Sequence, residues 1–228
     1  DIYGKKATGF NGSVIPTLYD IEESVVTHGY GDDGKEYTFL DRSNKLSVSK
    51  DSVMNGEFTV QVAIPSETNA PSAYDNYTPA MLNFYASSDN GIEANGNNEQ
   101  FYIYGYDDDA VTDTIGPEIK MLVLNSESFK NGDNVNESPL VMAAISDDSG
   151  INLSNSGIGH QMTITIDGKT TYSDISSYYT PDFANSGNSG SVNYSLNNLS
   201  EGNHTLKFKV WDTFNNSSEQ SIDFNVVT

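Results

Sequence analysis

Cysteine is absent from the 228 residues, and cationic side chains are scarce. Without cysteine, these residues can supply no disulfide, no thiolate metal ligand and no cysteine nucleophile. The 11 Lys and Arg stand against 32 Asp and Glu, which gives a formal net charge of −21. This balance argues against nucleic acid and against anionic lipid as partners, because both are bound through clustered cationic groups.

Long apolar runs and a leader segment are also missing. No stretch approaches the roughly 18 consecutive apolar residues of a membrane-spanning helix, so direct membrane insertion is not expected. The sequence opens with Asp1 rather than Met and has no apolar leader, so we interpret it as a mature or excised segment. Aromatic residues make up 11 % of the chain, too many for a disordered acidic tail. The composition predicts a soluble, acidic, extracytoplasmic globular protein.

The hydrophobic pattern has a period of two almost everywhere. Apolar residues alternate with polar ones over 57–64, 162–166, 203–210 and 222–226. Such alternation places one face of a strand on a core and the other in water. Turn dipeptides separate the runs, and Asp167-Gly168 predicts a tight hairpin. We therefore expect an all-β chain of two tandem immunoglobulin-like antiparallel β-sandwich domains.

An acidic segment marks the expected boundary between the domains. It follows an aromatic run, Phe101 to Tyr104, and ends at Gly116-Pro117, where a new strand is expected because proline favours strand starts. The sequence predicts domain 1 over 1–108, an acidic linker over 109–114 and domain 2 over 115–228. Each domain would hold roughly seven strands, as two facing sheets require.

A catalytic site is difficult to assemble from these residues. The histidines are His28, His160 and His204, and no GxSxG or HExxH motif occurs. His204 begins an alternating strand and is expected to pack beside the core, while His160 follows a glycine-containing loop that leaves a site open there. Carboxylates are plentiful, but spacing along the chain cannot show whether two of them flank a sugar. We predict no catalytic residue and no enzyme activity for this segment.

Calcium is the one cofactor that the pattern favours. Acidic residues gather at the joint between the domains and at two expected strand ends, and Ca²⁺ takes six to eight oxygen ligands that such loops can supply together. The candidate calcium ligands are Asp107, Asp109, Asp113, Asp147, Asp148 and Asp212. The alternative is that these carboxylates only keep the joint soluble and the domains apart.

Tyrosines offer a further candidate surface. Tyr102, Tyr104 and Tyr106 fall on one side of the aromatic run, and Tyr178-Tyr179 falls in an expected loop. Exposed aromatic rings bind sugars by stacking, whereas tyrosines also fill sheet faces because they favour strands. Both interpretations remain open.

Several motif blocks resemble one known family. In the second half they are Ser146–Asn152, Gly157–His160, Ile166–Gly168, Tyr178–Asp182, Gly190–Tyr194 and Trp211–Ser218; in the first half they are Phe10–Asp20, Asn55–Phe58 and Glu93–Gly96. In this order the blocks resemble the region after the catalytic domain in the PorU-type sortases of the type IX secretion system. These sortases are gingipain-related cysteine endopeptidases of Bacteroidetes.

The resemblance implies a larger parent at the outer-membrane surface of a Gram-negative bacterium, which removes sorting signals from secreted cargo. Its His–Cys dyad would lie in a gingipain-like domain upstream, and a C-terminal sorting-type domain would follow. This segment would be a non-catalytic scaffold between the two, in contact with both and with cargo or a secretion-system outer-membrane protein. Two alternatives are a free-standing adhesin or carbohydrate-binding module and, with only the carboxylates in support, an acid-based hydrolase.

Overall fold

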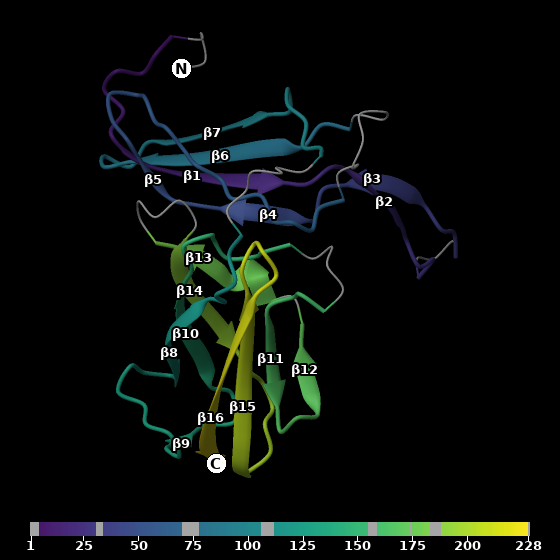
Figure 1. The fold of residues 1–228 in the computed structure, drawn as a ribbon, viewed down its shortest axis with the longest axis vertical. Helices are drawn as coiled ribbons and strands as arrows, with labels where there is room; N and C mark the ends of the chain where they lie inside the picture. The colour runs from purple at the N-terminus through teal and green to yellow at the C-terminus, as the bar shows by residue number, and fades with distance from the viewer. Residues whose placement is uncertain are drawn as a thin grey trace.

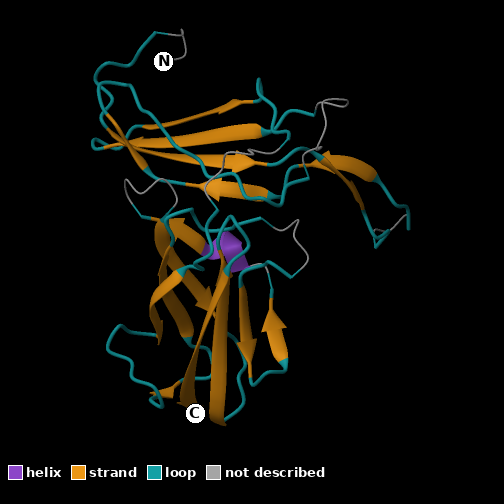
Figure 2. Cartoon of the chain, in the orientation of Figure 1, coloured by secondary structure: helices purple, strands orange, loops and turns teal. Residues whose placement is uncertain are grey.

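The computed structural model describes residues 5–30, 34–69, 78–105, 112–154, 159–173, 175–182 and 188–227. Over these ranges nearly all regular structure is β-strand, and the one short helix is a 3-10 turn, η1 (Ile175–Tyr178) (Figure 2). The ladders are antiparallel except for a short parallel pairing of β16 with β9. The predicted all-β class is therefore confirmed. No helix of the described residues is long and apolar enough to cross a membrane.

The second half of the chain contains two sheets that share one core (Figure 1). The first sheet has the order β13-β14-β10-β8, and the second has the order β12-β11-β15-β16-β9. Their strands are β8 (Glu118–Leu124), β9 (Asn134–Val135), β10 (Leu140–Ser146), β11 (Thr163–Ile166), β12 (Thr170–Tyr172), β13 (Tyr179–Pro181), β14 (Ser189–Ser195), β15 (Gly202–Trp211) and β16 (Ser217–Val226). Alternate residues of both sheets, such as Val141 on β10 and Phe208 on β15, fill the space between them and are fully buried.

The period-two pattern predicted these strands correctly. Leu206 and Phe208 on β15 face the core, as do Ile222 and Phe224 on β16, while the residues between them are more exposed. The predicted Asp167-Gly168 hairpin joins β11 to β12. Both of its residues have positive φ, 53° and 63°, which suits the mirror-image turns of tight hairpins.

The first half contains a five-stranded sheet and a separate two-stranded ribbon. Its strands are β1 (Gly12–Tyr19), β2 (Glu23–Val26), β3 (Thr38–Asp41), β4 (Lys45–Val48), β5 (Asp51–Val53), β6 (Met81–Ser88) and β7 (Glu93–Asn98). In the sheet, β1 lies at the centre, between β6 on one side and β4 and β5 on the other. In Figure 1 the ribbon of β2 and β3 extends away from this sheet.

Two runs that alternate like strands do not pair as strands. Residues 58–64 and 101–104 form no ladder among the described residues, although Val62 is half-buried while Gln61 is exposed. Both runs line an apolar hollow with Leu18 and Leu82 on the sheet. Phe58 and Ile64 remain 43 % and 51 % exposed, so alternation over this run predicted neither a ladder nor a buried face. The described part of the first half has one sheet rather than two facing sheets.

No sheet of the described residues mixes strands from the two halves. Strands β1 to β7 pair only among themselves, and so do β8 to β16. Residues 106–111, which include half of the expected linker, lie outside the described residues. The division into 1–108, 109–114 and 115–228 thus stays a prediction.

Candidate functional site

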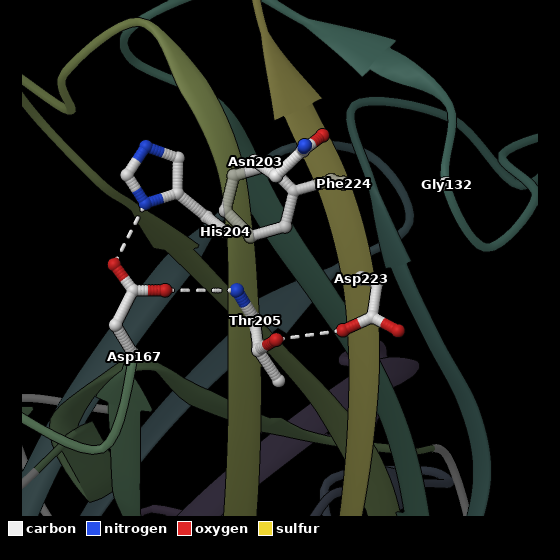
Figure 3. A pocket seen from close by; sticks show the side chains of 7 residues that line it. All are labelled: Gly132, Asp167, Asn203, His204, Thr205, Asp223 and Phe224. Carbon is white, nitrogen blue, oxygen red and sulfur yellow. Dashed lines mark hydrogen bonds and ion pairs between the residues drawn. The ribbon is translucent and has the colours of Figure 1, made fainter.

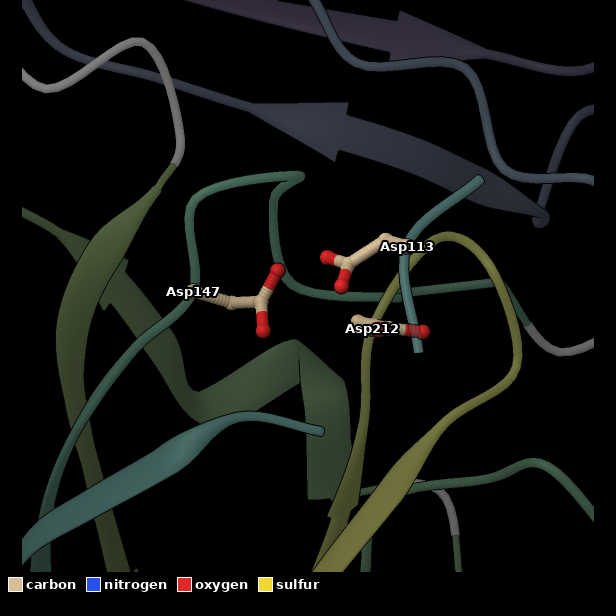
Figure 4. Close-up of side chains that lie close together, drawn as sticks. All are labelled: Asp113, Asp147 and Asp212. Atoms are coloured by element: carbon tan, nitrogen blue, oxygen red, sulfur yellow. The ribbon is translucent and has the colours of Figure 1, made fainter. Parts of the chain in front are cut away.

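Three aspartates from distant parts of the sequence meet at the end of the second half that faces the first (Figure 4). Asp113 precedes β8, Asp147 follows β10 and Asp212 follows β15, and their carboxylate oxygens lie within 4.8 Å of one another. An isolated bridge between Ile151 and Asp212 holds the loop after β10 against the loop after β15. The group, called the aspartate trio below, is therefore positioned by the ends of three strands.

Asp212 is the best anchored member of the trio. It is fully buried, and its Oδ1 accepts the backbone N–H groups of Phe214 at 2.9 Å and Asn216 at 2.7 Å. Its Oδ2 accepts the side-chain amide of Asn216 at 2.7 Å. A carboxylate that accepts several N–H donors closes a loop much as an Asx turn does. This side chain organises the connection between β15 and β16.

The other two members lie in contrasting environments. Burial raises the pKa of Asp147, and the nearby charges of Asp212 and Asp113 add to this, while hydrogen bonds from Ser149 oppose it. The backbone N–H of Ile115 holds the pKa of the half-buried Asp113 below its usual value. The trio thus concentrates negative charge around a partly buried carboxylate, an arrangement that a cation would relieve.

The trio contains three of the six candidate calcium ligands. Asp113, Asp147 and Asp212 come together as the sequence suggested. Asp107 and Asp109 lie outside the described residues. Asp148 is exposed and is not part of the trio, although its backbone carbonyl accepts the side-chain amide of Asn188 at 2.8 Å. Carboxylate and carbonyl oxygens are the ligands that Ca²⁺ prefers, so the residues present fit this ion.

We expect Ca²⁺ to bind the trio, which can be tested by calorimetry of chelator-treated protein. Millimolar Ca²⁺ should release or absorb heat, and a free concentration about 100-fold above the Kd would raise the free energy of unfolding by about 2.7 kcal/mol. Asp147→Asn should abolish the heat, and Asp148→Asn should preserve it. If neither heat nor a melting shift appears, calcium binding at the trio is refuted.

A second cluster surrounds His204, which lies near the start of β15 on the same face as the core residues Leu206 and Phe208 (Figure 3). Its Nδ1 lies 2.8 Å from Oδ2 of Asp167, in the turn between β11 and β12, and its ring stacks on Phe224 at 5.5 Å between centroids. The side chain is 8 % exposed, so the expected packing beside the core is confirmed. These residues line a shallow pocket of about 290 Å³ with Gly132, Asn203, Thr205 and Asp223.

A hydrolytic triad is suggested by the grouping of Ser200, His204 and Asp167, but the proton on the His204 ring opposes that role. Nε2 of His204 lies 2.8 Å from the carbonyl oxygen of Ser200, which can only accept a hydrogen bond, and 3.4 Å from the Ser200 hydroxyl. Nε2 must therefore carry a proton and cannot act as a base towards that hydroxyl. Since Nδ1 also faces a carboxylate, the arrangement favours an imidazolium that ties β15 to the turn.

The pH dependence of this tie follows from two pKa shifts. Burial lowers the pKa of His204, but its hydrogen bonds to Asp167 and to the Ser200 carbonyl outweigh burial and raise the pKa overall. The backbone N–H of Thr205 is the main cause that lowers the pKa of Asp167, with His204 adding to it. The free energy of unfolding that protonated His204 contributes is fully present below about pH 6.5, and it is lost as pH rises through the raised pKa. The Asp167 contribution is present above about pH 3.9 and is lost as pH falls through the lowered pKa.

Replacing His204 with glutamine should therefore lower the free energy of unfolding most between about pH 4 and 6.5. We expect about 1 kcal/mol there, because one partner of the charge-assisted hydrogen bond is partly exposed. Urea unfolding at pH 5.5 and at pH 9 measures the difference between the variant and the wild type. The gap should shrink at the higher pH, and a gap that is constant or grows would contradict the imidazolium tie.

The two halves also meet through a set of polar contacts, called the joint below. The backbone N–H and the hydroxyl of Ser66 both donate to the carbonyl of Thr213 at 2.9 Å. Glu67 Oε1 lies 2.6 Å from Nδ1 of His160 and accepts the Asn215 side-chain amide at 3.2 Å. The halves are thus held by hydrogen bonds besides the covalent connection between them.

A buried polar chain continues the joint. Ser154 of the second half donates to the side-chain oxygen of Asn44 at 3.2 Å, and the amide of Asn44 donates to Asp20 at 2.9 Å. All three side chains belong to residues that are less than 5 % exposed. Val48 on β4 belongs to the same apolar cluster as the core of the second half. Sequence reasoning missed this contact, because no local pattern links Asn44 to Ser154.

The remaining histidine and the tyrosines occupy varied positions. His28 contacts only the ring of Tyr30 among the described ring pairs, with centroids 5.8 Å apart. Tyr102 and Tyr104 are 51 % and 55 % exposed, and Tyr106 lies outside the described residues. Tyr179 is buried, which raises its pKa.

Tyr178 is half-exposed and belongs to a small aromatic cluster. Its ring meets that of Tyr194 edge-on at 4.9 Å, and Tyr172 lies 5.5 Å from Tyr194 on the other side. Three tyrosines therefore gather on the surface of the second half.

Comparison with solved structures finds a similar segment in a longer chain. The chain is similar to the chain in the crystal structure of dimeric latent PorU from Porphyromonas gingivalis, with 31 % sequence identity and a TM-score of 0.49. The similarity covers 100 % of this chain but 21 % of the PorU chain, so it concerns one segment of a longer protein. No protein-family model matches the chain. No curated protein matches it either.

The motif blocks in the sequence resemble the same family of sortases. Because the 228 residues contain no cysteine, they supply no cysteine-based catalysis.

Proposed function

We propose that the chain is a non-catalytic scaffold segment of a PorU-related cysteine endopeptidase, located between the gingipain-like catalytic domain and a C-terminal sorting-type domain. The observation that carries the proposal is the 31 % identity to PorU along the full chain, over about a fifth of the PorU chain. The absence of cysteine supports it, because the nucleophile of such a peptidase would have to lie elsewhere in the parent.

The role of the segment in this proposal is mechanical. Residues 1–108 and 115–228 act as two β-domains, the second of them immunoglobulin-like, that fix the distance and angle between their neighbours in the parent. The polar contacts of Ser66 and Glu67 with the second half support this role, because a docked pair transmits orientation better than a flexible tether. Calcium at the aspartate trio would stiffen the same joint.

The parent in this proposal is exposed at the outer-membrane surface of a Gram-negative bacterium, where it removes sorting signals from cargo of the type IX secretion system. The segment would contact the catalytic domain, the C-terminal domain and, through its remaining surface, cargo or a secretion-system outer-membrane protein.

Deletion within the parent tests the proposal. A parent that lacks residues 115–228 should lose most processing of cargo, while its catalytic domain still reacts with a small thiol-directed active-site probe. Substitution of the dyad cysteine serves as the control that loses both. Unchanged cargo processing by the deleted parent would refute the scaffold role.

A free-standing carbohydrate-binding module or adhesin is the second candidate, and the exposed tyrosines favour it. Tyr102, Tyr104 and the cluster around Tyr178 present rings that can stack on sugars. A glycan array with the wild type and Tyr178→Ala separates the two functions. Selective glycan binding that the substitution abolishes would support the module, and an array without hits would remove it.

A further inference from the structure

The ribbon of β2 and β3 is poorly covered by the rest of the described residues. In Figure 1 it extends beyond the sheet of the first half, and its extensive contacts are between its own two strands. Val26, Phe39 and Leu40 are 49 %, 48 % and 65 % exposed. A two-stranded ribbon alone in water is marginally stable, because it buries too little apolar surface.

The ribbon is apolar on both of its faces. Residues that lie directly opposite in an antiparallel pair share a face, so Val25 and Phe39 point to one side while Leu40 and Val26 point to the other. Both outer edges of the ribbon are open, since no described strand pairs with β2 or β3 except the other. A natural edge strand is normally blunted by polar or charged residues, as β7 is by its exposed Glu and Asn side chains. On the ribbon the charged strand residues stand only at the base, Glu23 and Asp41, while Val25, Val26, Phe39 and Leu40 beyond them are apolar.

The base of the ribbon is firmly held. Asp20, which is 1 % exposed, accepts the backbone N–H of Asn69 at 2.7 Å and the amide of Asn44 at 2.9 Å. Arg42 forms ion pairs with Glu22 at 3.3 Å and Glu99 at 3.5 Å. The ribbon therefore projects from a fixed base.

The negative charge of the ribbon favours a cationic partner. Residues 23–41 contain five carboxylates and one lysine, a net charge of −4 with His28 neutral. Glu23 and Asp41 lie directly opposite each other, and like charges in that position repel. A second copy of this chain, with a net charge of −21, would bring more negative charge to the same place. A cationic partner would relieve the repulsion.

We propose that the β2–β3 ribbon is a docking arm that binds an extended segment of another protein as an added strand. That segment carries Lys or Arg next to the Glu23–Asp41 row and apolar residues next to the Val25–Phe39 and Leu40 rows. Its backbone completes an open edge, its apolar side chains cover the exposed ones, and its cationic groups pair with the carboxylates. The proposal does not depend on the identity of the parent.

A synthetic peptide of two Lys-Val-Val-Thr repeats is the probe, titrated into this chain by fluorescence anisotropy. It should bind the wild type, and the double substitution Phe39→Ser, Leu40→Ser should weaken it at least tenfold. The charge reversal Asp41→Lys should also weaken it at least tenfold. Thr38→Ser, on the same strand, is the matched control and should bind as the wild type does. Near-ultraviolet circular dichroism checks that each variant stays folded.

Three further measurements can overturn the proposal. A peptide with Glu in place of Lys, or one with N-methylated backbone amides, should bind at least tenfold more weakly, and equal binding of either would refute the charge selection or the strand addition. Binding of the Lys peptide that the Phe39 and Leu40 substitutions do not change would place it elsewhere. Sedimentation velocity that finds a dimer, dissolved by those substitutions, would make a second copy the occupant and refute the basic partner.

Discussion

Asp212→Ala should lower the free energy of unfolding of the second half by about 3 kcal/mol. The substitution removes the acceptor of three N–H donors, those of the Phe214 backbone and of the backbone and side chain of Asn216. These donors lie in the connection between β15 and β16, the two longest strands of their sheet, and unpaired donors are costly even in a partly buried loop. Urea unfolding followed by far-ultraviolet circular dichroism measures the loss.

Two companion variants separate the causes. Asp212→Asn keeps an oxygen for the two backbone donors but removes the charge, so it should cost about half as much as alanine. Asp148→Ala, at an exposed position outside the trio, should change stability by no more than about 0.5 kcal/mol. If Asp212→Ala were as mild as Asp148→Ala, the loop would not depend on this carboxylate.

Asn44→Leu should loosen the joint and cost about 2–3 kcal/mol. Leucine has a similar volume but cannot donate to Asp20 or accept from Ser154, and both of these groups are buried. The substitution removes a hydrogen bond within the first half and another between the halves. Urea unfolding measures the loss of both hydrogen bonds together. A separate measurement is therefore needed for the bond between the halves.

Pulsed electron spin resonance supplies that measurement. Cysteines introduced at Ser52 on β5 and Thr170 on β12, both exposed, would be the only labelling sites because the chain has no cysteine of its own. The distance distribution between the labels should be narrow in the wild type and broader with Asn44→Leu. Ser43→Ala, at the exposed neighbouring position, should leave it unchanged. A wild-type distribution as broad as that of the variant would show that the halves are not docked.

The sequence predicted the second half better than the first. In β15 and β16 alternation coincides with a neighbouring strand, so the predicted faces and the observed ladders agree. Residues 58–64 alternate as clearly, yet they have no ladder among the described residues. Local pattern determines which side of a strand is apolar, while pairing depends on the partner that the rest of the chain brings into place. That partner is not encoded in the run itself.

The candidate sites follow the same division. The aspartate trio could be anticipated, because each member stands beside a recognisable strand end and strand ends gather at one edge of a sheet. The bond of His204 to Asp167 could not, since 37 residues separate them and only the register of β11 with β15 brings them together. The contact between Asn44 and Ser154 is longer still in sequence, spanning 110 residues between two separate sheets. The hydrophobic pattern of a single segment does not predict a contact of that kind.

The chain's single tryptophan provides an optical signal for the joint. The ring of Trp211 contacts that of His160 in a tilted arrangement with centroids 4.3 Å apart, and His160 in turn meets Glu67 of the first half. An imidazole in contact with an indole quenches its emission, and more strongly when it is protonated. Separation of the halves would withdraw Glu67 and free the His160 ring, so the emission of Trp211 would change before either β-domain unfolds. Opening of the joint could thus be followed in real time in the unlabelled protein.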